Sequence, residues 1–161
     1  MSINPIFLKG LGLAVLVILL DQATKFYILG ALTVGIDGRV IILPFFNLVL
    51  VWNKGISFGM FHNFAHAQAL FSVAAILIVA LLVGWLYKAE DRLSGLALGL
   101  IIGGAAGNIF DRIAFGSVVD FLDFHIGAYH WPAFNIADSA VCVGAFLLIF
   151  HGFFANKKQP A

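Results

Sequence analysis

Uncharged apolar stretches constrain this chain more than any other feature of its sequence. Residues 67–87 form 21 consecutive positions without a charged side chain. A helix needs about 20 mostly apolar residues to cross the hydrocarbon core of a bilayer, so this stretch alone is long enough. Three further apolar segments have a similar length: 7–29, 93–113 and 136–155. The sequence therefore predicts four membrane-spanning helices.

The composition excludes several other classes of protein. Apolar residues make up 62% of the 161 residues and charged residues only 11%, whereas soluble domains carry roughly 25% charged residues. So little polar surface cannot cover a globule in water, which excludes a soluble enzyme, a nucleic-acid-binding protein and a disordered chain. The length fits a single domain over residues 1–155, with a short cytoplasmic tail over residues 156–161.

The connection between the first two predicted helices, residues 30–66, does not have the pattern of a membrane helix. Its middle, from Val40 to Trp52, is rich in β-branched and aromatic residues and contains Pro44, which favours short strands over a fifth crossing. We therefore expect an all-α membrane protein: four transmembrane helices with a small extracytoplasmic β-rich connection between helices 1 and 2. Connections of this length inside compact domains usually carry function.

The distribution of basic residues predicts the orientation in the membrane. Four crossings return the chain to the side on which it starts, and that side carries five basic residues in short flanks against four on the other side. Because basic residues are in excess on the cytoplasmic side, both termini are expected in the cytoplasm. The five are Lys9, Lys88, Arg92, Lys157 and Lys158, and the four are Lys25, Arg39, Lys54 and Arg112.

Glycine recurs at every fourth residue of the third predicted helix, at Gly95, Gly99, Gly103 and Gly107. Small residues at this spacing allow the backbone of another helix to approach closely. We expect helix packing at Gly95 and Gly99. At Gly103 and Gly107 the same small residues also leave room for a substrate chain, so both interpretations stay open there.

Most of the acidic residues gather at one membrane face. Charged groups in hydrocarbon cost about 2.5–3.5 kcal/mol on insertion scales, so they persist mainly where they are paired or functional. Asp21 and Lys25 stand four residues apart on a helix and can pair, whereas Asp111 and Arg112 are adjacent and each needs another partner. We expect these four residues to support the structure or the site. The acids at this face are Asp21, Asp111, Asp120, Asp123 and Asp138.

Asp120 and Asp138 have no basic neighbour within a helical turn, and an expected loop, 121–133, separates them. Neighbouring helices lie about 8–10 Å apart, so two carboxylates at facing ends can share one water molecule. Two close carboxylates do not both ionise readily, which leaves one as the base and the other as the acid, as in aspartic proteases. The pattern alone leaves two alternatives open. One is a catalytic pair with Asp123 in place of Asp120, and the other is a proton relay or ion site formed by these acids.

Other catalytic chemistries have less support. The sequence contains no G-x-S-x-G motif, Ser139 has no evident histidine base, and Cys142 lies in an apolar segment that disfavours a thiolate. His125 and His130 stand five residues apart without the spacing of a metal site, so no metal is expected.

Five blocks of sequence, in order, resemble one known family. The blocks are DQATK at 21–25, NKGISFG at 53–59, GGAAGNIFDR at 103–112, VVDF at 118–121 and FNIADSA at 134–140. Together they extend over most of the chain, and they are similar to the motifs of lipoprotein signal peptidase, or signal peptidase II, a family of bacterial membrane aspartic proteases.

The resemblance implies removal of signal peptides from prolipoproteins, by cleavage just before a cysteine that carries a diacylglyceryl group. It implies Asp120 and Asp138 as the catalytic pair, in preference to Asp123, and it implies no metal or organic cofactor. It also implies supporting roles for Asp21, Lys25, Asn53, Gly55, Gly104, Asn108, Arg112, Asn135 and Ala137.

The expected partners are lipid-modified prolipoproteins and membrane lipid, without nucleic acid and without a second subunit. The expected location is the bacterial cytoplasmic (inner) membrane, with several crossings and the active site near the outer leaflet. Asn108 and Asn135 are expected to hydrogen-bond a carboxylate or the substrate backbone. The alternative function is a small proton- or ion-coupled transporter, although the sequence shows no internal repeat of the kind that transporters carry.

Overall fold

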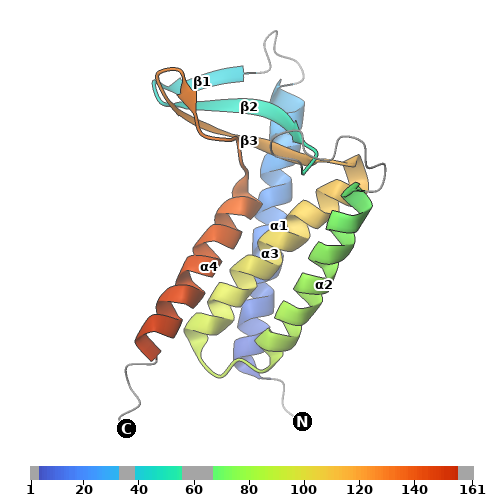
Figure 1. Cartoon of the computed structure of the whole chain (residues 1–161), viewed down its shortest axis with the longest axis vertical. Coiled ribbons are helices and arrows are strands. Elements are labelled where there is room, and N and C mark those ends of the chain that lie inside the picture. The colour runs from blue at the N-terminus through green and yellow to red at the C-terminus, as the bar shows by residue number, and fades with distance from the viewer. Residues whose placement is uncertain (1–3, 33–38, 56–66, 156–161) are drawn as a thin grey trace.

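The computed structural model describes residues 4–32, 39–55 and 67–155. Within them, four helices run side by side, and an antiparallel sheet lies across one end of the helices (Figure 1). The helices are α1 (Pro5–Leu32), α2 (Ala67–Tyr87), α3 (Arg92–Phe115) and α4 (Ile136–Ala155). The strands are β1 (Arg39–Leu43), β2 (Phe46–Asn53), β3 (Val118–Ile126) and β4 (Tyr129–His130). The predicted tail, 156–161, lies outside the described residues.

Three of the described helices are long and apolar enough to cross a membrane. The spans are Pro5–Ala31, Arg92–Phe115 and Ile136–Phe153, with mean hydropathies of 1.9, 1.7 and 1.8. In α2 the segment Ser72–Tyr87 counts as a shorter apolar helix. The described chain is thus a mostly helical membrane protein with a small sheet, in which three helices meet the length and hydropathy of a membrane span.

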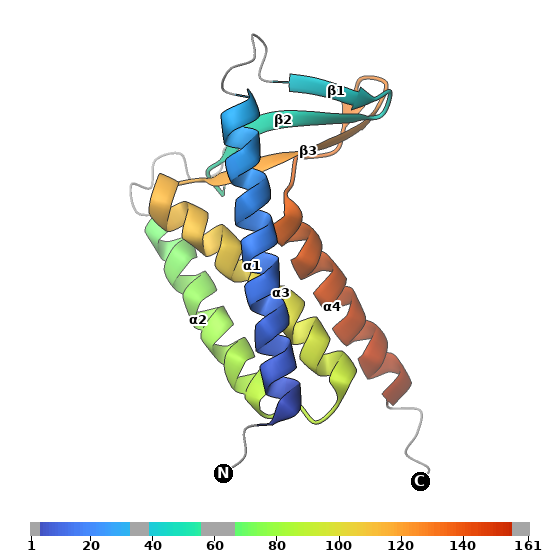
Figure 2. The same cartoon turned by 180° about the vertical axis from the view of Figure 1, so that it is seen from behind.

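The helix α3 lies between α2 and α4 and also packs against α1 (Figures 1 and 2). A methyl group placed on Gly99 would collide with the backbone of Gly10 in α1, and one placed on Gly95 would collide with Ile6. The predicted helix packing at Gly95 and Gly99 is therefore confirmed, and Gly10 contributes a small residue from the opposite helix.

The second interpretation of the glycine pattern, room for a substrate chain, is wrong for Gly103 and Gly107. A Cβ atom on Gly103 would lie 2.6 Å from the carbonyl oxygen of Ala14, and one on Gly107 would lie 2.7 Å from the carboxylate of Asp21. Both neighbours belong to α1. Because residues four apart share one face of a helix, α1 covers the whole glycine row and fills the space.

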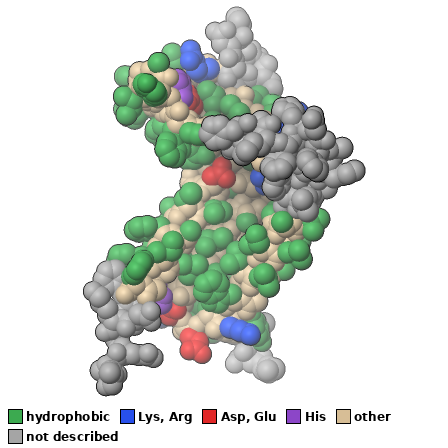
Figure 3. Space-filling model, in the orientation of Figure 1, with side chains coloured by type: hydrophobic (Ala, Val, Ile, Leu, Met, Phe, Trp, Pro, Cys, Tyr) green, Lys and Arg blue, Asp and Glu red, His purple; other side chains and the backbone are tan. Residues whose placement is uncertain are grey.

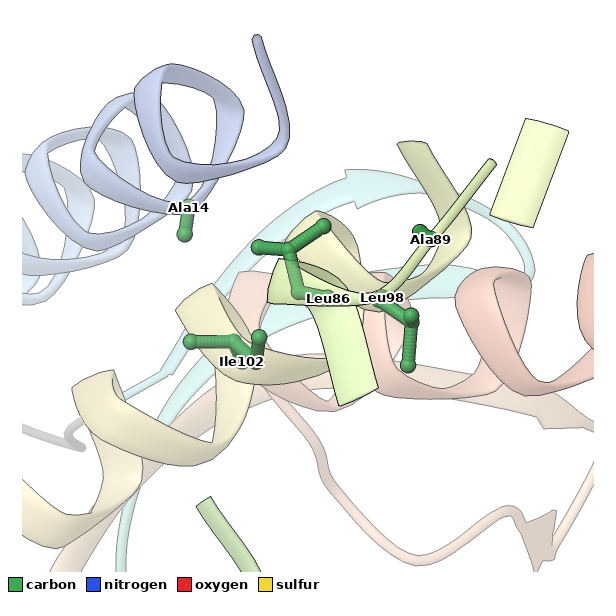
Figure 4. Close-up of a cluster of buried hydrophobic side chains, with 5 residues drawn as sticks. All are labelled: Ala14, Leu86, Ala89, Leu98 and Ile102. Carbon is green, nitrogen blue, oxygen red and sulfur yellow. The ribbon is translucent and has the colours of Figure 1, made fainter. Parts of the chain in front are cut away.

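A small apolar cluster forms where α1, α2 and α3 meet (Figure 4). Its buried members are Ala14, Leu86, Ala89, Leu98 and Ile102. Most large apolar side chains of the helices are instead exposed on their outer faces, where Figure 3 shows them in green. Lipid chains can solvate such a surface, so a broad buried core is not required.

The sheet has the strand order β1-β2-β3-β4 with antiparallel pairing throughout. The first two strands come from the connection that was predicted to hold short strands. The expectation of a loop over 121–133 is wrong, because β3 continues to Ile126 and pairs with β2. Pairing with β2 satisfies backbone groups that a loop would leave to water.

The end of α3 sets the direction of β3. The helix ends at Phe115 because Gly116 adopts the left-handed conformation, with φ of 70°, and its N–H donates to the carbonyl of Arg112. This C-terminal cap suits glycine, which has no Cβ atom to clash. The chain then turns across the end of the bundle, which brings Asp120 over the helix ends.

We predict that Gly99→Ala destabilises the protein by about 1–3 kcal/mol, because the added methyl group meets backbone that cannot move aside. The measurement is thermal or denaturant unfolding in detergent. Gly12→Ala is the matched control, since nothing lies within 4 Å of a Cβ atom at Gly12. That variant should keep or slightly raise stability, as alanine favours helix. Equal stability of the two variants would contradict the packing described here.

Candidate active site

Asp120 and Asp138 reach the site from different elements. Asp120 lies in β3, and Asp138 lies in the first turn of α4. The start of α4 is a reciprocal cap: the Asn135 side chain accepts from the Asp138 backbone N–H at 2.9 Å, and the Asp138 carboxylate accepts from the Asn135 backbone N–H at 3.2 Å. This local helix-start motif fixes the position of Asp138.

Three asparagine side chains donate to the two carboxylates. Asp120 accepts from Asn53 Nδ2 at 2.8 Å and from Asn135 Nδ2 at 2.7 Å. Asp138 accepts from Asn108 Nδ2 at 2.8 Å. The hydrogen bonds expected of Asn108 and Asn135 are therefore present, and Asn135 contacts both acids.

The orientation of each asparagine amide is fixed by the donor that its oxygen accepts from. Asn53 Oδ1 accepts from the Gly55 backbone N–H at 2.8 Å, in a turn where Gly55 has φ of 78°. Asn108 Oδ1 accepts from Asn135 Nδ2 at 3.1 Å and from Lys25 Nζ at 3.0 Å. With each oxygen occupied in this way, each NH2 group faces a carboxylate.

Lys25 is 2% exposed and lies between two fully buried acids. Its Nζ atom is 2.8 Å from Asp21 Oδ2 and 2.8 Å from Asp111 Oδ2. The predicted Asp21–Lys25 pair is confirmed, and the partner that Asp111 required is also Lys25. Buried charges are tolerated when they are paired and hydrogen-bonded in this way.

The same two carboxylates hold the backbone at the start of the elements that carry the candidate pair. Asp21 Oδ1 accepts from the Ala137 N–H at 2.9 Å, next to Asp138. Asp111 Oδ2 accepts from the Val119 N–H at 3.1 Å, next to Asp120. The buried charges therefore fix the spacing between β3 and α4.

Two other predicted residues shape the junction of α3 and α4. A Cβ atom on Gly104 would collide with the carbonyl of Ala137, so the two backbones touch there. Arg112 Nη1 donates to the Asn108 carbonyl at 3.2 Å, within its own helix. The structure thus brings all the predicted site residues around one end of the bundle, where Figure 3 shows acidic atoms in a recess between sheet and helices.

Asp123 belongs to a separate cluster. Its carboxylate accepts from Asn47 Nδ2 at 2.8 Å and lies 2.8 Å from His130 Nδ1, so it ties β2 to β4. Burial acts to raise the pKa of Asp123, but the hydrogen bonds from Asn47 and His130 outweigh it and lower the pKa. A carboxylate held ionised in this way suits a structural contact.

Asp120 has the opposite environment. Its pKa is raised to about 6: burial is the largest cause, the nearby charge of Asp138 also raises the pKa, and hydrogen bonds from Asn53 and Asn135 act against the rise. Asp138 is more accessible and lies in the first turn of a helix, where the helix dipole favours a negative charge. The two carboxyl groups thus lie in different environments, and Asp120 is the one whose surroundings favour the protonated form.

Sequence reasoning missed two parts of this arrangement. Gln22 bridges the buried acids, donating to Asp111 at 2.8 Å and to Asp21 at 3.1 Å, and a contact between two helices has no signal in one sequence. The cap at the start of α4 did have a signal, because Asn135 precedes Asp138 by three residues as in a capping box. Among the described residues no cluster of three or more His, Cys, Asp or Glu side chains could hold a metal.

Comparison with known proteins places this arrangement in context. A family described as Signal peptidase (SPase) II matches residues 13–154. The lipoprotein signal peptidase of Vibrio cholerae is 43% identical over 157 residues, which cover 96% of this chain and 92% of that protein. The lipoprotein signal peptidase of Aeromonas hydrophila is 48% identical over 155 residues, covering 94% and 92%. A solved structure of a bacterial membrane enzyme superposes with a TM-score of 0.77 at 32% identity, covering 95% of this chain and 93% of the other.

The raised pKa of Asp120 predicts a pH-dependent effect of Asp120→Asn on stability. A folded-state pKa of about 6 lies above that of an unfolded aspartate, so the folded state binds the proton more tightly. The stability that the folded protein gains by binding this proton is present at low pH and is lost as the pH rises through about 6. Asp120→Asn avoids that loss, so its unfolding temperature relative to the natural protein should be higher at about pH 8 than at about pH 4.5.

Asp123→Asn is the matched control for this measurement, because the pKa of Asp123 is shifted in the opposite direction to that of Asp120. Because the folded-state pKa of Asp123 is lowered, its stability contribution is present above the unfolded pKa and is lost on acidification. Both pKa values of Asp123 lie below about 4, so Asp123→Asn should cost nearly the same stability at about pH 8 as at about pH 4.5. The same pH trend in both variants would contradict the environments assigned to these two acids.

Proposed function

The chain belongs to the signal peptidase II family, and on that premise we propose that Asp120 and Asp138 are its catalytic pair. Proteins of this family are membrane aspartic peptidases, and this one removes signal peptides from prolipoproteins. The proposed cut lies just before the lipid-modified cysteine. The observation that carries the assignment is the pair of carboxyl groups linked through Asn135 and Asn108.

The proposed mechanism gives the two acids different roles. Ionised Asp138 takes a proton from water, and the oxygen of that water attacks the scissile carbonyl carbon. Protonated Asp120 stabilises the developing negative oxygen and then gives its proton to the leaving amine as the carbon–nitrogen bond breaks. Transfer of a proton from Asp138 to Asp120 restores the starting state. Water and two carboxyl groups suffice, so the reaction uses no cofactor.

The position of the pair suits a substrate held in the membrane. The sheet that carries Asp120 lies across the ends of the helices, and the outer faces of those helices are apolar (Figures 1 and 3). A signal peptide and its lipid can approach from the bilayer while water arrives from above. Since α1 covers the glycine row of α3, the lipid chains do not use that row. They approach along the exposed helix faces instead.

We predict that Asp120→Asn and Asp138→Asn each lower the cleavage rate of a diacylglyceryl-modified prolipoprotein by at least about 100-fold, since each removes one acid–base group. The measurement is release of signal peptide by purified protein in detergent, with folding checked by thermal unfolding. Asp123→Asn is the control and should remain active, because its carboxylate contacts Asn47 and His130 instead. Full activity in either folded variant of the pair would remove the assignment.

The proposed topology has four crossings, a single subunit, both termini in the cytoplasm and the sheet at the outer leaflet. The length of α2, 21 residues, and its course beside α1 and α3 support the fourth crossing. The start of α1 and the end of α4 lie at the same end of the bundle, opposite the sheet (Figure 2). This arrangement brings the site to the side where exported lipoproteins emerge.

We predict from this topology that a reporter active only in the cytoplasm, fused after the last residue, is active in bacterial cells. A reporter active only outside the cytoplasm should be active when it is inserted between β1 and β2, at Pro44. The reverse pattern would invert the topology without affecting the catalytic pair. The transporter alternative is not favoured, because the family and both relatives are named as peptidases.

A further inference from the structure

Lys25 makes a contact that the ion pairs alone do not require. Its ammonium group has three N–H donors, and two of them reach Asp21 and Asp111. The third reaches Asn108 Oδ1 at 3.0 Å, although Lys25 touches neither Asp120 nor Asp138 directly in the contacts of the described chain. Asn108 in turn donates its amide to Asp138.

We propose that Lys25 is a positioning residue for catalysis, which holds the Asn108 amide with its NH2 group toward Asp138. The proposal rests on the proposed role of Asp138 and deepens it. Lys25 is buried among side chains of α1 and α3, and its hydrogen-bonded route to Asp138 runs through Asn108, while its charge also acts at a distance to lower the pKa of Asp120.

The two ends of an asparagine amide have nearly the same shape, so packing alone does not choose between them. The reversed orientation would direct the NH2 group of Asn108 at the ammonium of Lys25 and at the amide NH2 of Asn135, both of which are donors. It would also direct the carbonyl oxygen at the Asp138 carboxylate. Lys25, together with the Asn135 amide, therefore favours the orientation in which Asp138 receives a hydrogen bond.

A purely structural role for Lys25 is the competing explanation, since Asp21 and Asp111 also hold the backbone of Ala137 and Val119. The two roles can be separated because asparagine can replace each of these acids as an acceptor of the backbone N–H. The triple variant Asp21→Asn/Lys25→Met/Asp111→Asn removes all three charges together. It retains acceptors for the backbone N–H groups of Ala137 and Val119, leaves no unpaired buried charge, and removes the ammonium that holds Asn108.

The triple variant should fold, with kcat at least about tenfold below the natural protein and KM within about twofold, because Lys25 does not touch substrate. Gln22→Leu is the matched control. Gln22 contacts the same two acids but not Asn108, so its loss should lower the unfolding temperature and leave kcat unchanged. A folded triple variant with the natural kcat would overturn the proposal.

A second variant keeps the proposal testable if the triple variant does not fold. Asn108→Leu leaves Lys25 and its ion pairs in place and removes the group through which Lys25 acts. It should lower kcat as the triple variant does, and natural kcat in Asn108→Leu would overturn the proposal. Where both changes can be combined, their effects on kcat should not add, because they break one chain of contacts. Additive losses would show that Lys25 acts by another route.

The failure of this proposal is distinguishable from the failure of the catalytic assignment. Activity in Asp138→Asn would remove the assignment and this inference with it. Loss of activity in Asp138→Asn, together with the natural kcat in the triple variant, would remove only the inference about Lys25.

Discussion

The structure depends on one buried ammonium group held between two buried carboxylates. Separating Lys25 from Asp21 or Asp111 would leave a charge in an environment that cannot solvate it, which costs several kcal/mol. This cost makes the relative positions of α1 and α3 nearly fixed at the end that carries the site. Each carboxylate also accepts a backbone N–H, one at the start of β3 and one at the start of α4. The ion pairs thereby place the strand and the helix that carry the two acids.

Close helix contacts make this polar cluster possible. In lipid the hydrophobic effect does not drive helices together, so contact between backbones and hydrogen bonding replace it. Glycines of α3 allow α1 to approach along its length, and Gly104 allows α4 to approach at Ala137. A larger residue at Gly107 would displace the Asp21 carboxylate. The packing of the helices and the geometry of the site are therefore parts of one arrangement.

The two candidate catalytic acids are held differently although they share asparagine donors. Burial of Asp120 raises its pKa to about 6, so its ionised form is disfavoured and folding bears part of that cost. Functional sites commonly retain such locally unfavourable groups, which the rest of the fold offsets. Asp138 lies at the start of a helix, where backbone N–H groups and the helix dipole favour a negative charge. Two groups of the same kind are thus held in different environments, which fits the proposed roles of acid for Asp120 and base for Asp138.

The sequence by itself determined the apolar segments, the close-packing glycines, the Asp21–Lys25 pair and the residues around the site, because these signals lie within a few residues of one another or in motifs. The tertiary structure decided that 118–126 is a strand of the sheet, that α1 fills the glycine row, and that Lys25 also pairs with Asp111. It also decided which asparagine faces which acid. Those contacts join residues far apart in the chain, such as Lys25 and Asn108, separated by 83 positions, and Asp21 and Ala137, separated by 116. Local patterns carry no record of such pairings, since they depend on how the helices and the sheet meet in space.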